Sequence, residues 1–277
     1  MRVLDLAFPT AALYSARLLN VVFRTKDGDE RSGMGTCFVV KAPDGEAFVV
    51  TARHVVDPEL ALIKFPGADL AAIFMAGWHY SKEVEDQRTF TALFPPTFLC
   101  SEDPNVDLAI IPLKTSLALP KGGGISEWIP FDWLAAESEY LDDIRVGDFL
   151  ASPGFTKLPG TELDRPVLLT GLIAGDPRFP IDVARPGGSV ARAVLYQSLS
   201  RSGLSGAPVF ATQRGFKYGE GLVGPEPRPL RLVGVNTGSF QDSQETPLQF
   251  SYFTRSTDLL ALLSEPHRRV DWRSTRE

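Results

Sequence analysis

Most apolar residues of this chain occur in short runs rich in Val, Ile, Leu and Phe, and Gly, Pro, Asp or Ser bounds most of these runs. This pattern is typical of many β-strands separated by turns rather than of helices. A chain of many short strands is expected to fold as an antiparallel barrel or sandwich. Strands are predicted at residues 18–24, 35–41, 46–51, 60–65, 107–113, 148–152, 165–173, 191–196, 208–211, 230–236 and 249–254.

One tight turn and one helix are also predicted. Pro43-Asp44-Gly45 lies between two apolar runs, and its glycine supplies the positive φ that a tight hairpin turn needs. Near the C-terminus, Ser256 or Thr257 offers a cap oxygen ahead of residues 258–263, whose leucines share one helical face. This helix should end before Pro266.

The chain divides into two parts of similar size. Its 277 residues, 44% hydrophobic and 22% charged, are enough for one large or two modest globular domains. Residues 120–140 contain Lys-Gly-Gly-Gly and an acidic stretch, so we expect a linker there between residues 1–119 and 141–277. Residues 213–229 carry several Gly and Pro and are expected to form an exposed loop.

Charge and hydropathy argue against nucleic-acid and membrane partners. The formal net charge is −6, and the basic residues 267–269, Arg273 and Arg276 suggest a solvated tail rather than a phosphate-binding face. No apolar stretch approaches the length of a membrane span. Residues 6–16 resemble a signal core but contain Pro9 and precede no clean cleavage site, so a cytoplasmic protein is expected.

Neither a metal nor a cofactor is expected. Cys37 and Cys100 are too few for a disulfide framework and too far apart for a C-x-x-C site, so reduced, buried thiols are predicted. His54, His79 and His267 show no metal-ligand spacing, and the last two are expected at the surface.

A candidate nucleophile lies in Ser202-Gly203-Leu204-Ser205-Gly206-Ala207-Pro208. Gly203 permits a tight turn that other residues resist, and Gly206 leaves room for a substrate next to Ser205. On such a turn the amides of Gly203 and Ser205 can point at one spot and bind an oxyanion.

A serine is a weak nucleophile at neutral pH, so it needs a base. His54 follows the apolar residues 48–50, which places its imidazole where a buried strand ends. Asp107 opens another apolar strand, where a carboxylate is costly without a partner, and it could orient the imidazole.

These segments, in the order His, Asp, Ser, resemble the trypsin-like (chymotrypsin-fold) serine peptidases. The matches are Thr51-Ala52-x-His54, Asp107-Leu108-Ala109 and Gly203-x-Ser205-Gly206-x-Pro208, with Gly35-Thr36-Cys37-Phe38-Val39 ahead of them. Residues 146–148, 169–173 and 234–238 are similar to the second barrel of bacterial HtrA-type proteases.

The resemblance implies an all-β fold of two antiparallel six-stranded β-barrels, at about residues 18–119 and 141–255, closed by the C-terminal α-helix. It implies a serine endopeptidase in which the first barrel carries His54 and Asp107 and the second carries Ser205, with protein or peptide substrates. The strand expected to pair with the substrate contains Val235, Asn236, Thr237 and Gly238. Gly238 would leave the wall of the substrate pocket open.

Departures from the family limit what it implies. Leu204 stands where digestive enzymes have an acid, so activation by a freed amino terminus is not expected and other contacts must order the loop. Leu199 occupies the specificity-pocket position that is acidic in trypsin, so a small or apolar substrate residue is favoured. No PDZ-like extension is expected to follow.

Two alternatives remain open. Each motif alone is more often structural than catalytic, and the chain could retain the barrels as a binding or scaffolding module. Ser205 could instead belong to an α/β-hydrolase with Asp258 and His267, although a strand rather than a helix is predicted directly after the serine.

Overall fold

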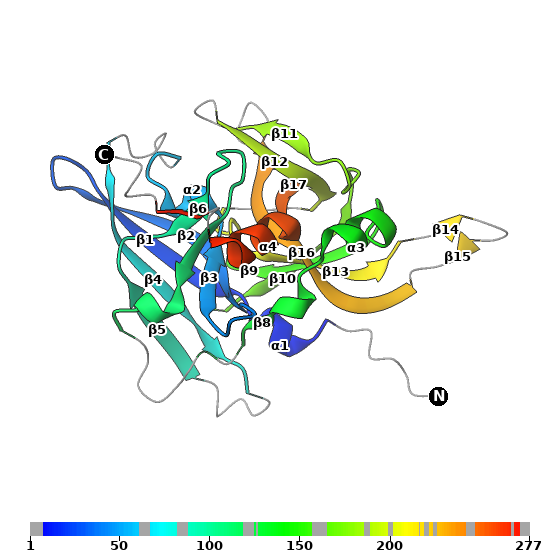
Figure 1. Ribbon diagram of the computed structural model, residues 1–277, viewed down its shortest axis with the longest axis horizontal. Helices are drawn as coiled ribbons and strands as arrows, with labels where there is room; N and C mark the ends of the chain where they lie inside the picture. Colours follow the sequence, from blue (N-terminus) through cyan, green and yellow to red (C-terminus); the bar gives the residue numbers. More distant parts are fainter. Residues whose placement is uncertain are drawn as a thin grey trace.

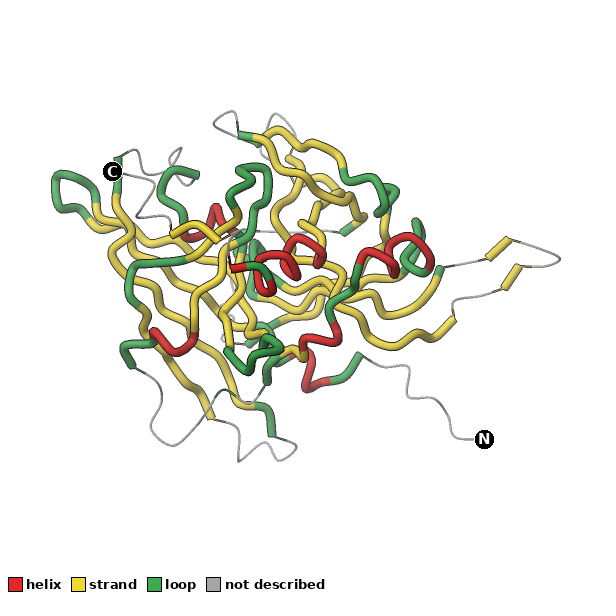
Figure 2. The backbone as a smooth tube through the Cα atoms, in the orientation of Figure 1, coloured by secondary structure: helices red, strands yellow, loops and turns green. Residues whose placement is uncertain are grey.

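Strands dominate the structure, a computed structural model in which the helices are short (Figures 1 and 2). Figure 1 shows two bodies, with β1–β5 on one side and β9–β17 with α4 on the other. The structure describes residues 8–60, 67–81, 88–118, 125, 127–156, 165–185, 189–198, 202–215, 217–218, 222–223, 226–241, 247–266 and 269–271.

The first sheet forms around β1, which pairs antiparallel with β2 on one side and β4 on the other. Its strands run in the order β18-β6-β7-β3-β2-β1-β4-β5, and β8 pairs parallel with β2. The strand bounds are β1 Arg17–Arg24, β2 Glu30–Lys41, β3 Ala47–Thr51, β4 Asp69–His79, β5 Arg88–Phe94, β6 Leu99–Ser101, β7 Ala109–Pro112, β8 Ile129–Pro130 and β18 Arg269–Asp271.

The second sheet closes on itself. The order β10-β9-β13-β16-β17-β12 returns to β10 through a β10–β12 pairing, so six strands form a ring, and β11 extends from β12. A separate hairpin joins β14 and β15. The bounds are β9 Phe149–Gly154, β10 Val167–Ile173, β11 Ile181–Ala184, β12 Val190–Gln197, β13 Pro208–Arg214, β14 Lys217–Tyr218, β15 Leu222–Val223, β16 Glu226–Gln241 and β17 Pro247–Arg255. The predicted all-β, double-barrel fold class is confirmed.

The helices are short. Their bounds are α1 Thr10–Leu13, α2 Arg53–Val56, α3 Glu137–Asp142 and α4 Ser256–Ser264, with 3₁₀ turns at Leu113–Thr115 and Phe131–Trp133. The C-terminal helix ends before Pro266 as predicted, but neither candidate residue caps it. Ser256 lies inside the helix, and its hydroxyl donates to the Ala135 carbonyl at 2.6 Å. Within the described residues, no helix is long and apolar enough to cross a membrane.

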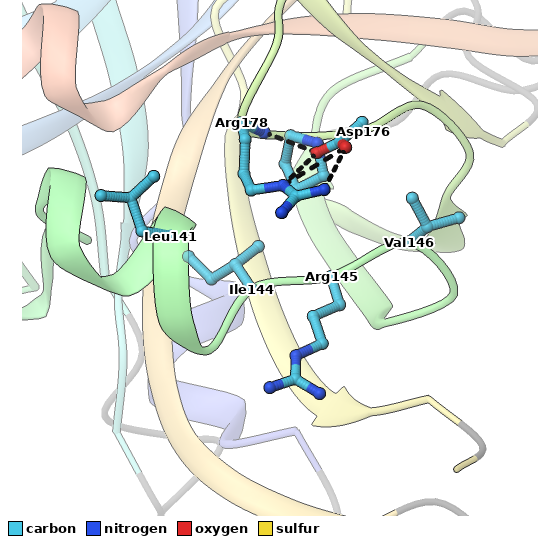
Figure 3. Close-up of a pocket in the computed structure, with 7 residues that line it drawn as sticks. Leu141, Ile144, Arg145, Val146, Asp176 and Arg178 are labelled. Atoms are coloured by element: carbon cyan, nitrogen blue, oxygen red, sulfur yellow. Dashed lines mark hydrogen bonds and ion pairs between the residues drawn. The ribbon is translucent and has the colours of Figure 1, made fainter. Parts of the chain in front are cut away.

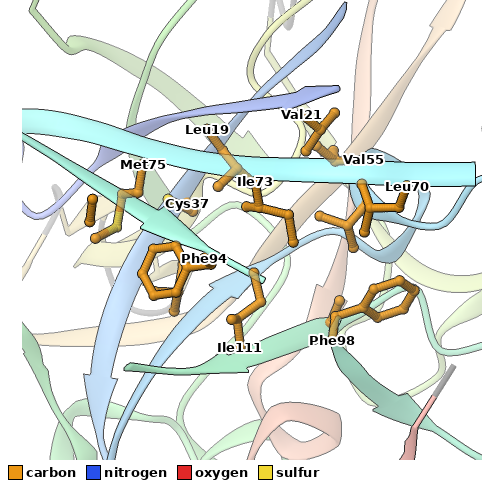
Figure 4. Packing of buried hydrophobic residues seen from close by; sticks show 14 of the residues in the cluster. Leu19, Val21, Cys37, Val55, Leu70, Ile73, Met75, Phe94, Phe98 and Ile111 are labelled. Carbon is orange, nitrogen blue, oxygen red and sulfur yellow. The ribbon is translucent and has the colours of Figure 1, made fainter. Parts of the chain in front are cut away.

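Four clusters of buried apolar residues form the core of the described structure, and two of them involve the first barrel. In the first barrel, alternate residues of β1 and β4 point inward, and Figure 4 shows Leu19 and Ile73 packed there near Phe94. Both cysteines are free and buried, as predicted, and Cys37 lies in this cluster. A second cluster combines first-barrel residues such as Phe38 with Phe210 and α4 residues, so the two barrels share a core. Each fully buried side chain of this kind stabilises the fold by about 1.5–3 kcal/mol.

The segment predicted as a linker takes part in both barrels. Within residues 120–140, β8 pairs with β2, and the Ala135 amide donates to the carbonyl of Leu232 in β16 at 2.9 Å. Tyr140 is fully buried, and its hydroxyl donates to the Val233 carbonyl. Short apolar stretches of this segment pack on both sheets. Its glycine-rich composition gave no indication of this packing. The domain limits themselves stay a prediction.

Three other local predictions need correction. The prediction of a solvated basic tail is wrong for β18, which pairs with β6. Residues 267–268 and 272–277 lie outside the described part. The prediction of an exposed loop at residues 213–229 is wrong at both ends, because β13 and β16 remain paired as far as Arg214 and Glu226. His79 is partly buried rather than at the surface, and its ring packs on Phe90 at 4.9 Å. The strand predicted at 60–65 falls mostly on residues 61–66, outside the described part.

Candidate active site

The imidazole of His54 is fixed by one carboxylate. His54 lies on α2, which begins two residues after β3 ends, in the middle of the first sheet. Its Nδ1 is 2.7 Å from Asp107 Oδ2, and its backbone amide donates to Asp107 Oδ1 at 2.9 Å. The side chain is 28% exposed, so one edge of the ring faces solvent.

Strand register explains why these two residues meet. Thr51 on β3 pairs with Ala109 on β7, and in an antiparallel pair each step forward on one strand matches a step back on the other. Two steps beyond this pair, the Arg53 amide donates to the Asp107 carbonyl at 3.3 Å. The carboxylate of Asp107 therefore lies directly beneath His54.

Asp107 is ionised despite being fully buried. Burial alone would raise its pKa, but the charge of His54, two hydrogen bonds from His54 and the guanidinium of Arg185 together lower the pKa below its ordinary value. An ionised carboxylate can only accept hydrogen bonds, so His54 Nδ1 carries the proton. Nε2 of the neutral ring is then left as the basic nitrogen.

Ser205 lies on a turn that packs against the segment leading to His54. The Thr36 amide donates to the Ser205 carbonyl at 2.8 Å. Gly206 has a φ of 90°, and a Cβ there would lie 3.1 Å from the Ala52 amide nitrogen, two residues before His54. Among the described residues none, His54 included, hydrogen-bonds to the Ser205 hydroxyl, which belongs to a half-buried residue.

The same turn presents two unused amides. Gly206 and Ala207 donate to the carbonyls of Asn236 and Leu204, at 2.7 and 2.9 Å. By contrast, the amides of Gly203 and Ser205 donate to no described residue. Free, preorganised amides beside a serine are the groups that stabilise an oxyanion.

Thr36 and Asn236 hold this turn in place. The Thr36 hydroxyl, fully buried on β2, donates to the Gly203 carbonyl at 2.8 Å and accepts from the Phe155 amide at 3.0 Å. The Asn236 side chain donates to the Leu204 carbonyl at 3.0 Å. These contacts order the turn without an acid at position 204, whose leucine is buried. The sequence pattern placed Thr36 only in a strand and gave no signal for this role.

No family model matches this sequence, and no curated protein matches it. Solved structures match in fold. An HtrA-type protease, AlgW, with a decapeptide, is 16% identical with a TM-score of 0.50, over 93% of this chain and 67% of that chain. The active form of the Rv3671c protease from M. tuberculosis is 17% identical (TM-score 0.48; 93% and 83% covered), and the protease Anisep from Arthrobacter nicotinovorans is 13% identical (TM-score 0.49; 91% and 95% covered).

The chain has the trypsin-like peptidase fold. The predicted resemblance is confirmed at the level of the fold alone, because the HtrA-type protease AlgW is only 16% identical to this chain. The second barrel continues from the serine turn directly into β13, which begins at Pro208. An α/β-hydrolase would have a helix at that point, so that alternative is wrong. Its partner Asp258 lies on α4, and His267 is outside the described residues.

Only part of the predicted substrate strand is free to pair. Val235 pairs with Pro208 on one side and Thr254 on the other. Both backbone groups of Asn236 bond to the serine turn, so the prediction that these two residues pair with substrate is wrong. The register of β13 against β16 ends at the Pro208–Val235 pair, two residues before Thr237.

Thr237 and Gly238 lie beyond the end of β13. Gly238 pairs with Tyr252 on β17, and Thr237 lies at a register shift in that pairing. The prediction that Gly238 leaves the pocket wall open is also wrong, because a Cβ there would lie 2.3 Å from the Tyr252 hydroxyl. Leu199, the predicted specificity residue, lies outside the described part.

A pocket on the surface of the second barrel contains none of the predicted site residues. It measures about 360 Å³ and lies beside α3, lined by Leu141, Ile144, Arg145, Val146, Asp176, Pro177 and Arg178 (Figure 3). Its ion pair, Asp176 with Arg178 at 2.7 Å, is largely exposed. Within the described part of the chain, no group of three or more His, Cys, Asp and Glu side chains is placed to hold a metal ion.

Proposed function

We propose that this chain is a serine endopeptidase that cleaves protein or peptide substrates with Ser205 as nucleophile, His54 as general base and Asp107 as the residue that orients His54. The observation that carries the proposal is the 2.7 Å contact of His54 Nδ1 with buried Asp107, since it leaves Nε2 as the basic nitrogen of the imidazole. The trypsin-like fold supports a hydrolase of the protease kind.

The first half of the reaction acylates the serine. Ser205 Oγ attacks the carbonyl carbon of the scissile peptide bond while Nε2 of His54 takes the hydroxyl proton. The oxyanion that forms accepts hydrogen bonds from the Gly203 and Ser205 amides. The C–N bond then breaks, His54 gives its proton to the leaving amine, and an acyl-enzyme ester remains.

The second half returns the enzyme to its starting state. A water molecule gives one proton to His54 Nε2 and attacks the ester carbon, the same amides stabilise the second oxyanion, and Ser205 leaves as a protonated hydroxyl. Asp107 remains ionised throughout and stabilises the imidazolium that forms twice per cycle.

An extended peptide is the substrate that suits this site. It would add a strand beside Thr237 and Gly238, which lie past the end of β13. A neighbour in fold, the HtrA-type protease AlgW, was solved with a decapeptide, which is consistent with a peptide substrate here. Because Leu199 stands at the specificity position of this resemblance, we propose a small or apolar residue before the cleaved bond.

The test is cleavage of a peptide library by the wild type and two serine variants, with products identified by mass spectrometry. Ser205→Ala should abolish cleavage. Ser202→Ala is the matched control, because Ser202 lies exposed on the same turn, and it should retain full cleavage. If the wild type cleaves nothing, or if Ser205→Ala cleaves as well as the wild type, the proposal is wrong and a binding or scaffolding role is favoured.

A further inference from the structure

A buried cation from the second barrel reaches the carboxylate of the first. Arg185 follows β11 at the turn toward β12, where its amide donates to the Ser189 carbonyl at 2.8 Å. Its side chain is 7% exposed, and its Nη2 lies 2.9 Å from Asp107 Oδ2. This is the same oxygen that His54 Nδ1 contacts at 2.7 Å, so two groups share it.

The hairpin that carries Arg185 is attached to the segment leading to Asp107. The Arg192 amide on β12 donates to the Asn105 carbonyl at 3.0 Å, and the Arg192 guanidinium pairs with Asp103 at 2.8 Å. Backbone and side-chain contacts therefore fix the hairpin beside the carboxylate. The contacts of the hairpin, and not only the reach of one long side chain, therefore place Arg185 beside Asp107.

The contact of Arg185 with Asp107 is electrostatic. None of the three guanidinium nitrogens makes an aligned hydrogen bond with a described residue, although Nη2 is at ion-pair distance. Asp107 is the only carboxylate within that distance of Arg185 in the described part of the chain. A buried cation needs an anion nearby, and here that anion is the group that orients the imidazole.

We propose that Arg185 is a positioning residue of this site: it holds Asp107 from the opposite barrel and weakens the attraction of Asp107 for protonated His54. The reason is that a cation beside the carboxylate offsets part of the negative charge that stabilises the imidazolium. The inference rests on the proposed function, because only a working base benefits from this adjustment.

The other groups near this pair are already paired or neutral. The charge of Arg53 on α2 also acts on Asp107, but Arg53 pairs with Asp57 at 2.8 Å. Burial raises the pKa of Tyr252 on β17 and of Cys100 on β6, so both are neutral at physiological pH. Arg185 is then the cation at ion-pair distance from Asp107, and its charge offsets the attraction of Asp107 for a proton on His54.

The experiment is an NMR titration of the His54 imidazole in the full-length protein, which has only three histidines to assign. Arg185→Gln and Arg185→Met remove the charge, and each should raise the titration midpoint by about one pH unit. Arg185→Lys keeps the charge and should stay within about 0.3 unit. Arg178→Gln is the matched control, because it removes an exposed ion pair, with Asp176, that involves neither Asp107 nor the contacts that fix the hairpin, and it should stay within about 0.3 unit too.

Activity provides a second, separate readout. The acidic limb of the pH profile of kcat/KM for peptide cleavage should move upward in the two neutral variants by the same amount as the titration. An unchanged or lowered midpoint in folded Arg185→Gln and Arg185→Met overturns the inference, even if all variants cleave peptides. If the midpoint rises but no protein cleaves, the charge coupling stands and the proposed function fails.

Discussion

Replacing Thr36 by valine removes one hydroxyl and keeps the shape of the side chain. That hydroxyl links the serine turn to the rest of the fold, because it donates to the Gly203 carbonyl and accepts from the Phe155 amide. The backbone amide of Thr36, which donates to the Ser205 carbonyl, is unaffected by the change. Thr36→Val therefore isolates what two side-chain hydrogen bonds do for the turn.

The expected cost follows from what is left unpaired. Thr36 is fully buried, so the Gly203 carbonyl and the Phe155 amide would each lose a partner out of reach of water. An unsatisfied buried group costs about 1–3 kcal/mol, and part of the cost can be relieved if the turn moves. We expect the free energy of unfolding to fall by about 3 kcal/mol. Movement of Gly203 displaces an oxyanion donor, which should lower kcat/KM about 100-fold.

Chemical denaturation and peptide-cleavage kinetics measure these two quantities. Thr212→Val is the matched control, because its half-buried hydroxyl donates to the Phe149 carbonyl at 3.2 Å, between β13 and β9 and not at the turn. It should cost about 1 kcal/mol of stability and leave kcat/KM unchanged. A folded Thr36→Val with the kcat/KM of the wild type would refute the reasoning.

Four more outcomes follow from the site and its packing. Asp107→Asn should keep the fold and lower kcat about 10⁴-fold, because the amide favours the wrong imidazole tautomer; near-normal turnover contradicts the role. Gly206→Ala should lower the free energy of unfolding by about 3 kcal/mol or more, since its Cβ would lie 2.0 Å from the Thr36 carbonyl oxygen. Gly45→Ala, with a φ of 87° but open surroundings, should cost only about 1 kcal/mol in the same denaturation assay. Finally, the pKa of Asp107 is lower in the folded chain than its ordinary 3.8, so the folded state binds fewer protons. The stabilisation from ionised Asp107 is complete above that value and lost below it, and acid should narrow the stability difference between wild type and Asp107→Asn.

The fold was largely predictable because its strands are short apolar runs between turn residues. Where that contrast is weak, the prediction failed. β4 was missed because small residues such as Ala71, Ala72 and Gly77 interrupt its large apolar side chains, although Leu70, Ile73 and Met75 are buried. Hydrogen-bonded pairing with β1 and β5 stabilises β4 as a strand, and the local sequence contains no pattern that predicts this pairing.

The candidate site was predictable only where neighbouring residues in the sequence form a recognisable motif. His54, Asp107 and Ser205 each lie in a local motif, and the register of β3 against β7 brings the first two together. Thr36 and Arg185 act across more than 70 residues of sequence, through contacts that exist only once two sheets have packed. A threonine in a strand and an arginine after one are common, so their sequence surroundings gave no signal.

The most direct test of the account is the rate at which a fluorophosphonate labels the protein at pH 7.5, with the modified residue located by mass spectrometry. One label per chain on Ser205 is expected, with none in Ser205→Ala and the normal rate in Ser202→Ala. His54→Ala should label far more slowly, because the hydroxyl has lost its base. Labelling of another residue, or an equal rate in folded His54→Ala, would contradict the claim that His54 activates Ser205.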